Sequence, residues 1–177
     1  MKIIDFGSGK SYLTFALYYY LYEIKKLNVE IVGLDLKKDV MENCEKLAIK
    51  YKFNNLKFLF GDIKDYKGFE NVDMVFSLHA CDIATDYCFL KGLELKAKAI
   101  LAVPCCQHEF NSKIRESKNT KLKESLPTLT SHGILQEKLS TLLTDGFRAD
   151  VMEMCGYKSK VIEFIDTEHT PKNLLIK

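Results

Sequence analysis

The sequence lacks long apolar runs, internal repeats, low-complexity tracts and any marked excess of charge of one sign. Its most apolar stretch, residues 12–22, is much shorter than the roughly 18 residues that a transmembrane helix needs. We therefore expect no membrane association and interpret this stretch as a buried helix. Because linkers are also absent, the chain is expected to form a single domain, 1–177. A net charge of +2 neither requires nor excludes a nucleic-acid partner.

The six cysteines have no regular spacing, and the sequence shows no secretory leader. A secreted domain held by disulfides is therefore not indicated, and we expect reduced thiols and a cytoplasmic location. The first predicted strand starts almost at Met1, which indicates a domain that belongs to a longer protein. Nothing in the composition implies a stable protein partner.

Residues 2–13 predict a strand, a glycine turn and the start of a helix. A short apolar run reaches Asp5, and Gly7 and Gly9 follow at alternate positions. Without a Cβ, each glycine can adopt a positive φ and let a ligand approach the main chain. The turn is therefore a candidate binding site, and its members are Asp5, Gly7, Ser8 and Gly9.

Three ligand classes use such a turn. A P-loop requires G-x-x-x-x-G-K-[ST], and Ile4 stands where its first glycine belongs, although Gly9 and the next two residues match. A dinucleotide fingerprint requires a third glycine where Tyr12 stands. The turn is most typical of an adenosine ligand without a pyrophosphate, such as S-adenosylmethionine, and a P-loop nucleotide site remains the alternative.

Two further predicted strands, residues 30–36 and 56–63, each end in an acid. Asp35 has the spacing from the turn at which nucleotide-binding folds place a carboxylate for the ribose hydroxyls. Its alternative role is to cap the helix predicted at residues 39–51. Asp62 is expected either to accept a hydrogen bond from an adenine amino group or to serve as a turn aspartate.

The apolar neighbours of these acids are also assigned to the cofactor. Leu36 or Ile63 is expected to pack on the face of the adenine ring. Leu78, at the end of the next predicted strand, completes the expected cofactor-binding set.

Residues 72–79 and 97–104 predict the fourth and fifth strands. Strands that alternate with helical stretches imply right-handed crossovers and a largely parallel sheet with helices on both faces. Ligands bind such sheets at the carboxyl ends of the strands. One site can therefore collect the residues found at those ends: Gly7, Asp35, Asp62, His79 and Cys105.

The C-terminal part of the sequence predicts a helix and two strands. Apolar residues recur with a 3.6-residue period from Gly133 to near Gly156, which predicts one long helix. Residues 160–165 and 173–176 predict the last strands. The loop between them is too short for a crossover helix, so we expect an antiparallel hairpin whose tip lies at the rim of the site.

Two clusters, residues 78–86 and 103–109, follow the fourth and fifth strands and are expected to face each other. His79 and His108 are the candidate catalytic residues, which would orient the attacking group or accept its proton. The alternative is that both histidines only bind loop backbone.

The cysteines of the same clusters leave two further alternatives, a metal site and a cysteine–histidine nucleophile. Neither cluster has the C-x-x-C spacing of a strong zinc motif, so we predict no metal ligands. The cysteines involved are Cys81, Cys105 and Cys106.

Residues 109–131 carry five basic side chains against few acids. This segment is expected to be either a basic lid that meets RNA phosphates or a solvated surface. The basic residues are Lys113, Arg115, Lys118, Lys121 and Lys123.

Four motifs in this order resemble those of class I S-adenosylmethionine-dependent methyltransferases, in a group that includes methyltransferase-like proteins of unassigned substrate. They are D-F-G-S-G-K-S-Y-L at 5–13, H-x-C-x-x-A-T-D at 79–86, P-C-C-Q-H at 104–108 and E-H-T-P-K-N at 168–173. The central two are also similar to motifs of tRNA 2′-O-methyltransferases that modify the acceptor stem.

The resemblance implies a Rossmann-like α/β fold, a three-layer α/β/α sandwich around a mostly parallel seven-stranded sheet with an antiparallel C-terminal hairpin. It also implies S-adenosylmethionine as cofactor, bound by Asp5, Gly7, Ser8, Gly9, Asp35 and Asp62, and RNA, either tRNA or rRNA, as substrate. Asp82 stands where the related run has glycine. An inactive cofactor- or RNA-binding module of the same fold is therefore the alternative.

Overall fold

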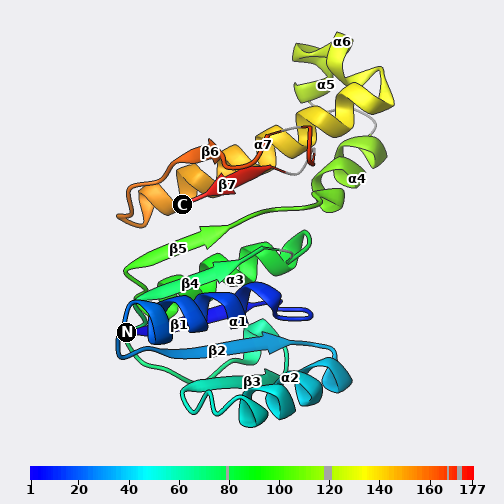
Figure 1. Ribbon diagram of the computed structural model, residues 1–177. Coiled ribbons are helices and arrows are strands. Elements are labelled where there is room, and N and C mark those ends of the chain that lie inside the picture. Colours follow the sequence, from blue (N-terminus) through cyan, green and yellow to red (C-terminus); the bar gives the residue numbers. More distant parts are fainter. Residues whose placement is uncertain (79, 118–120, 167, 171–172) are drawn as a thin grey trace.

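The computed structural model describes residues 1–78, 80–117, 121–166, 168–170 and 173–177 (Figure 1). Within these residues, strands form one seven-stranded sheet in the order β3-β2-β1-β4-β5-β7-β6. The strands are β1 (Lys2–Phe6), β2 (Glu30–Asp35), β3 (Leu56–Phe60), β4 (Met74–Ser77), β5 (Ala99–Ala102), β6 (Val161–Glu163) and β7 (Leu174–Ile176). The first five are mutually parallel, whereas β7 runs antiparallel to β5 and β6. The predicted mostly parallel sheet with an antiparallel C-terminal pair is confirmed.

Helices cover both faces of the sheet; Figure 1 shows α1 in front of the strands and α3 behind them. The α-helices are α1 (Tyr12–Tyr18), α2 (Lys38–Lys50), α3 (Ile83–Glu94), α4 (His108–Glu116), α5 (Lys121–Ser125), α6 (Pro127–Thr130) and α7 (Gly133–Met154). A π-helical segment, η1 (Tyr19–Ile24), continues α1, and a 3-10 turn, η2 (Ile63–Asp65), follows β3. The long helix predicted from Gly133 is confirmed.

Side-chain alternation along the strands supplies two apolar cores. Ile3 of β1 packs in a cluster with Tyr18 and Met41, on the α1 and α2 face. Its neighbour Ile4 packs in a second cluster with Phe89 and Met152, on the α3 and α7 face. Because both faces are covered, successive residues of the central strands are apolar rather than alternating with polar ones. The expected three layers are therefore present.

The interpretation of residues 12–22 as a buried helix is wrong. Only Thr14 and Tyr18 of the α1–η1 segment are buried, and Tyr12 is 77% exposed. A helix on the outside of a sheet buries one stripe of its surface, so the remaining apolar side chains face solvent. Within the described residues, no helix has both the length and the apolar character needed to cross a bilayer.

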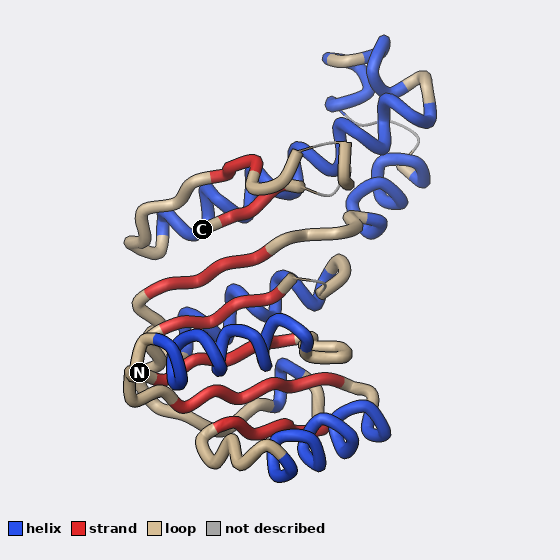
Figure 2. Tube along the Cα trace, viewed as in Figure 1, coloured by secondary structure: helices blue, strands red, loops and turns tan. Residues whose placement is uncertain are grey.

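The C-terminal strands join the parallel part of the sheet through a narrow seam. A single residue pair, Ala102 and Ile176, is in register between β5 and β7. Beside it, residues of β5, α7 and the C-terminus enclose a cavity of about 410 Å³. Figure 2 shows β6, β7 and α7 together on the far side of this seam, with α4 to α6 beyond the end of β5.

Gly146 provides a test of the α7 assignment. It lies inside the helix, and a Cβ at this position would meet no heavy atom within 4 Å. Gly146→Ala is expected to raise the free energy of unfolding by about 0.5–1 kcal/mol, because alanine loses less backbone entropy on folding. Urea denaturation followed by circular dichroism measures the change.

Gly33→Ala is the contrasting variant, because its Cβ would lie 2.7 Å from the Phe58 ring. This variant is expected to destabilise the protein. A loss of stability in Gly146→Ala would contradict the packing described for α7.

Candidate functional site

A cavity of about 350 Å³ lies over the carboxyl ends of the first four strands. This volume is within the usual range for small-molecule sites. The cavity is lined by Gly7, Leu34, Asp35, Leu36, Gly61, Asp62, Ile63, Ala80, Cys81, Ile83, Ala84 and Tyr87. Five of the residues predicted from the sequence to bind a cofactor are therefore brought together in its wall: Gly7, Asp35, Leu36, Asp62 and Ile63.

The glycine turn after β1 is bonded directly to the end of β2. The N–H groups of Gly7 and Ser8 both donate to the carbonyl of Leu34, at 2.8 and 3.1 Å. Gly7 has a φ of 71°, in the left-handed region that favours glycine. The turn therefore presents its main chain to the cavity without a side chain in between.

Asp35 faces this turn. One carboxylate oxygen accepts the N–H of Gly9 at 2.9 Å, and the other accepts the N–H of Lys37 at 3.0 Å. A carboxylate oxygen has two lone pairs, so each retains acceptor capacity for a ligand. The side chain is thus fixed in place while it remains able to bind hydroxyl groups.

Asp62 has the turn role that was one of its two predicted alternatives, and it also lies in the cavity wall. Its carboxylate accepts the N–H of Lys64 at 3.1 Å and so caps η2, while the residue also lines the cavity. The neighbouring apolar walls differ in exposure, because Leu36 is 66% exposed and Ile63 is buried. Leu36 therefore projects into solvent at the edge of the cavity, whereas Ile63 is packed in the apolar core.

The other predicted cofactor residues lie outside the lining of this cavity. The Ser8 hydroxyl contacts the Met41 sulfur at 3.7 Å, toward α2. Gly9 contributes to the site indirectly, because its N–H donates to the Asp35 carboxylate. Leu78 follows β4 and is half-buried.

Asp5 is buried behind the turn, where Thr14 Oγ1 donates to its carboxylate at 2.5 Å. Burial raises the pKa of Asp5 to about 7, and the nearby charge of Asp35 adds to this effect, while the Thr14 hydrogen bond opposes it. Near neutral pH, Asp5 is therefore poised between its protonated and ionised forms.

Of the two histidines predicted to be catalytic, the structure describes His108. His108 is exposed and is the first residue of α4, at the carboxyl-terminal edge of the sheet. His79 lies outside the described residues. Cys81, Cys105 and Cys106, in contrast, come together at one point between the loops that follow β4 and β5.

Asp82 connects those two loops. Its N–H donates to the carbonyl of Cys106 at 3.1 Å, and its carboxylate accepts the N–H of Glu109 at 3.0 Å. Its φ of 52° is a strained conformation for a residue other than glycine, with a typical cost of about 1–3 kcal/mol. The tertiary hydrogen bonds hold this conformation, so the loop keeps an aspartate where the related motif has glycine.

Arg148 of α7 braces the same region. Its Nη2 donates to the carbonyl of Asp82 at 2.9 Å, and its Nε donates to Asp86 at 2.7 Å. Its Nη1 donates at 3.0 Å to Asp145, which is buried and also accepts from Gln107. Because buried charges must be paired, this network fixes both loops against α7.

Three cavity residues on α3 had not been identified from the sequence as ligand-binding. Ile83, Ala84 and Tyr87 line the cavity at spacings of three and four residues, which places them on one helical face. The helical spacing of these three residues is the only feature of the sequence that groups them on one side of α3. It does not say which face of α3 meets a ligand.

Comparison with known proteins gives the family. A family profile described as a methyltransferase domain matches residues 1–113, and the chain belongs to this family. The comparison with curated proteins found no match.

Solved structures share the fold at low sequence identity. An S-adenosylmethionine-dependent methyltransferase from Aquifex aeolicus aligns with 99% of this chain and 79% of its own, at 14% identity and a TM-score of 0.57. Coclaurine N-methyltransferase, bound to N-methylheliamine and S-adenosylhomocysteine, aligns with 57% of this chain and 30% of its own, at 15% identity and a TM-score of 0.45. The [4+2]-cyclase SpnF aligns with 57% of this chain and 37% of its own, at 12% identity and a TM-score of 0.46. The chain thus spans less than two fifths of the length of the last two proteins.

The fold and family define a class I S-adenosylmethionine-dependent methyltransferase domain. The cavity fits this cofactor in three respects. Gly7 leaves the main chain open, Asp35 offers acceptors for a ribose diol, and apolar side chains flank Asp62 where an adenine ring would lie.

Asp5 gives a test of the electrostatics. In the unfolded chain its carboxyl ionises near the ordinary value of 3.8, and in the folded protein near 7. As pH rises, the unfolded chain therefore loses this proton at a lower pH than the folded protein does. The contribution of Asp5 to the free energy of unfolding is greatest below about pH 4 and decreases as pH rises toward 7. The expected loss of unfolding free energy between about pH 4 and pH 8 is on the order of 3 kcal/mol.

Asp5→Asn is expected to remove this fall, and urea titrations at several pH values measure it. Asp39→Asn on the exposed side of α2 is the matched control, which should keep the wild-type pH profile. If stability changed with pH in the same way in Asp5→Asn and the wild type, the pKa of Asp5 in the folded protein would not be raised.

Proposed function

We propose that this chain binds S-adenosylmethionine in the 350 Å³ cavity and transfers its methyl group directly to an acceptor. The observation that carries the proposal is the bond between Gly9 N–H and the Asp35 carboxylate. It holds a pair of acceptor oxygens beside a turn whose glycines, Gly7 and Gly9, leave the main chain uncovered, and a nucleoside sugar needs such acceptors for its hydroxyl groups. Asp62 would accept the adenine amino group, and Leu36 and Ile63 would pack on the ring.

S-adenosylmethionine, when bound, supplies a methyl group on a positively charged sulfur. The protein's own contribution is to hold donor and acceptor in line, and this orientation accounts for most of the rate gain. His108 and His79 would orient the attacking group or accept its proton. Direct displacement needs no covalent enzyme intermediate, so no nucleophilic cysteine is required.

RNA is the acceptor class that we assign, in line with the resemblance of the central motifs to tRNA 2′-O-methyltransferases. Arg115 and Lys121 are exposed on α4 and α5, beyond the carboxyl end of β5. Lys113 nearby pairs with Glu109 at 2.6 Å, which reduces its availability for phosphate. These two exposed basic side chains, although acidic residues lie among them, support an acceptor with a phosphate backbone.

Two alternatives to methyl transfer, a P-loop nucleotide site and an inactive module, are supported less well by the structure. The turn between β1 and α1 comprises Gly7 to Ser11 and is shorter than the eight-residue P-loop pattern. Asp82, which motivated an inactive module, is held in a glycine-like conformation by its hydrogen bonds.

Asp35→Asn tests the cofactor site. The exchange removes the charge that strengthens hydrogen bonds from the ribose hydroxyls, and affinity for S-adenosylmethionine should fall about 10- to 100-fold. Isothermal calorimetry measures it, and Asp39→Asn serves as the control with unchanged affinity. Equal affinities for Asp35→Asn and the wild type, with both proteins folded, would refute the proposed binding mode.

Labelled S-adenosylmethionine with total RNA and, separately, protein extract tests the acceptor. Label is expected in RNA, and the paired variant Arg115→Glu and Lys121→Glu should reduce it without weakening cofactor binding. The control Lys46→Glu and Lys50→Glu, on exposed positions of α2, should retain it. Label in protein alone would refute RNA as acceptor, and cofactor binding without any transfer would identify a binding module.

A further inference from the structure

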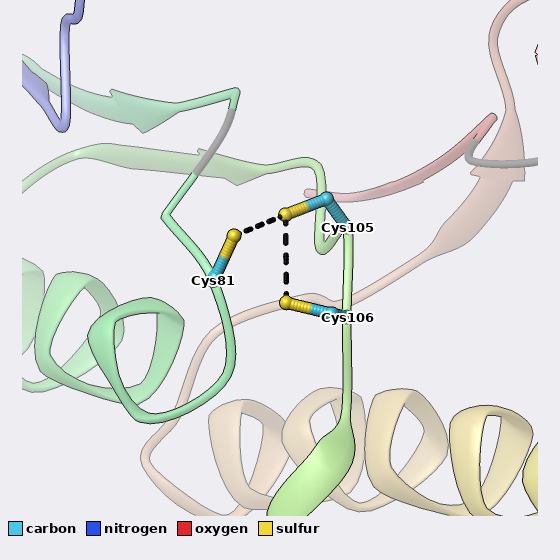
Figure 3. A group of neighbouring side chains, drawn as sticks. All are labelled: Cys81, Cys105 and Cys106. Carbon is cyan, nitrogen blue, oxygen red and sulfur yellow. Dashed lines mark hydrogen bonds between the residues drawn. The ribbon is translucent and has the colours of Figure 1, made fainter.

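Three of the six cysteines lie apart from one another, and the other three form a cluster. Cys44 and Cys88 are buried in the two apolar cores, and Cys155 is exposed just after α7. The other three converge: their sulfur atoms all lie within 4.8 Å of one another. Figure 3 shows that the side chains of Cys81, Cys105 and Cys106 point toward a common centre from the two loops.

The spacing of the sulfur atoms matches a site for one metal ion in one pair and is about 1 Å too short in another. Zinc is held by thiolates at about 2.3 Å, so two sulfurs of a tetrahedral site are about 3.8 Å apart. The sulfurs of Cys105 and Cys106 are 3.8 Å apart, and those of Cys81 and Cys105 are 2.7 Å apart. Opening the shorter pair takes about 1 Å of movement by Cys81, whose side chain is exposed.

The backbone around the three cysteines is fixed without any ligand. Asp82, directly after Cys81, donates its N–H to the carbonyl of Cys106. The carbonyl of Cys81 accepts the N–H of Ala84 at 3.1 Å in the first turn of α3. Ligands on two loops that are already joined lose little freedom on binding an ion, which favours affinity.

Two other roles explain the cluster less well. Simple packing does not account for it, because Cys81 is exposed and the other two are only half-buried. An activated nucleophile needs a lowered pKa. Here the hydrogen bond with Cys105 raises the pKa of the Cys81 thiol, and burial raises the pKa of Cys105 and Cys106.

We propose that Cys81, Cys105 and Cys106 together bind one zinc ion. Three thiolates leave the fourth tetrahedral position for water or another donor, as in zinc sites that take part in chemistry. Each thiol would release its proton to solvent when the ion binds. Cys81 also lines the 350 Å³ cavity, so the ion would lie at the edge of the methyl-donor site.

This proposal departs from the sequence-based prediction of no metal ligands, which relied on the absence of C-x-x-C spacing. Adjacent cysteines on an extended strand point to opposite sides. Here Cys105 and Cys106 lie beyond the end of β5, and both sulfurs face Cys81 (Figure 3). The site goes beyond methyl transfer, and neither proposal requires the other.

The test begins with protein purified without chelators and analysed for metal by mass spectrometry. The wild type is expected to contain one zinc ion per chain, and the triple variant C81S/C105S/C106S none. Metal-free protein titrated with Co²⁺ should develop sulfur-to-cobalt charge-transfer bands, weakened in each single serine variant. Cys155→Ser is the matched control and should retain both zinc and the cobalt bands.

Circular dichroism confirms that each variant is folded, and calorimetry with S-adenosylmethionine reports separately on the cofactor site. A triple variant that keeps as much zinc as the wild type would overturn the proposal. So would a wild-type protein that shows neither zinc nor cobalt bands after each ion is added. A disulfide between Cys81 and Cys105 in freshly isolated, metal-free protein would replace the metal site with a redox pair.

Discussion

The hydrogen bond from Gly9 to the Asp35 carboxylate is the contact on which the arrangement of the cavity depends. It joins the turn after β1 to the end of β2, two segments that a parallel sheet brings to the same edge. The same carboxylate accepts from Lys37, which fixes the start of the segment that leads to α2. One side chain thus sets the position of a turn, a strand end and a helix approach around the volume where the nucleoside of the cofactor would lie.

The opposite wall of the cavity is held by different chemistry. Asp82 ties the loop after β4 to the loop after β5, and Arg148 fixes both against α7 through a buried ionic network. Removing either partner of such a network leaves an uncompensated buried charge, which is far more costly than losing a surface pair. This wall of the cavity is therefore coupled to α7, although none of the described residues of that helix lines the cavity.

Local patterns predicted much of the fold. The five parallel strands and α7 follow from apolar runs and periodicity. Asp35 and Asp62 were predicted to bind a ligand because each lies near the carboxyl end of a predicted strand, and both line the cavity. Exposure was harder to predict: residues 12–22 look apolar throughout, but which side of α1 is covered depends on the sheet beneath it. For the same reason the sequence did not show that Ser8 turns toward α2, that Tyr87 faces the cavity, or that neighbouring cysteines converge. These features are set by how elements dock, and the sequence around each residue does not contain that information.

The seam between β5 and β7 has a consequence for how the molecule opens. Only one residue pair is in register across it, whereas β1 and β2 are paired along their full lengths. Folded proteins open locally in cooperative units, and the units with the fewest contacts to the rest of the structure open most easily. The β6–β7 pair is therefore expected to separate from the sheet before the parallel strands do, and Gly7, Asp35 and Asp62 all lie outside it. Such an opening would leave the strands whose carboxyl ends border the cavity paired with one another.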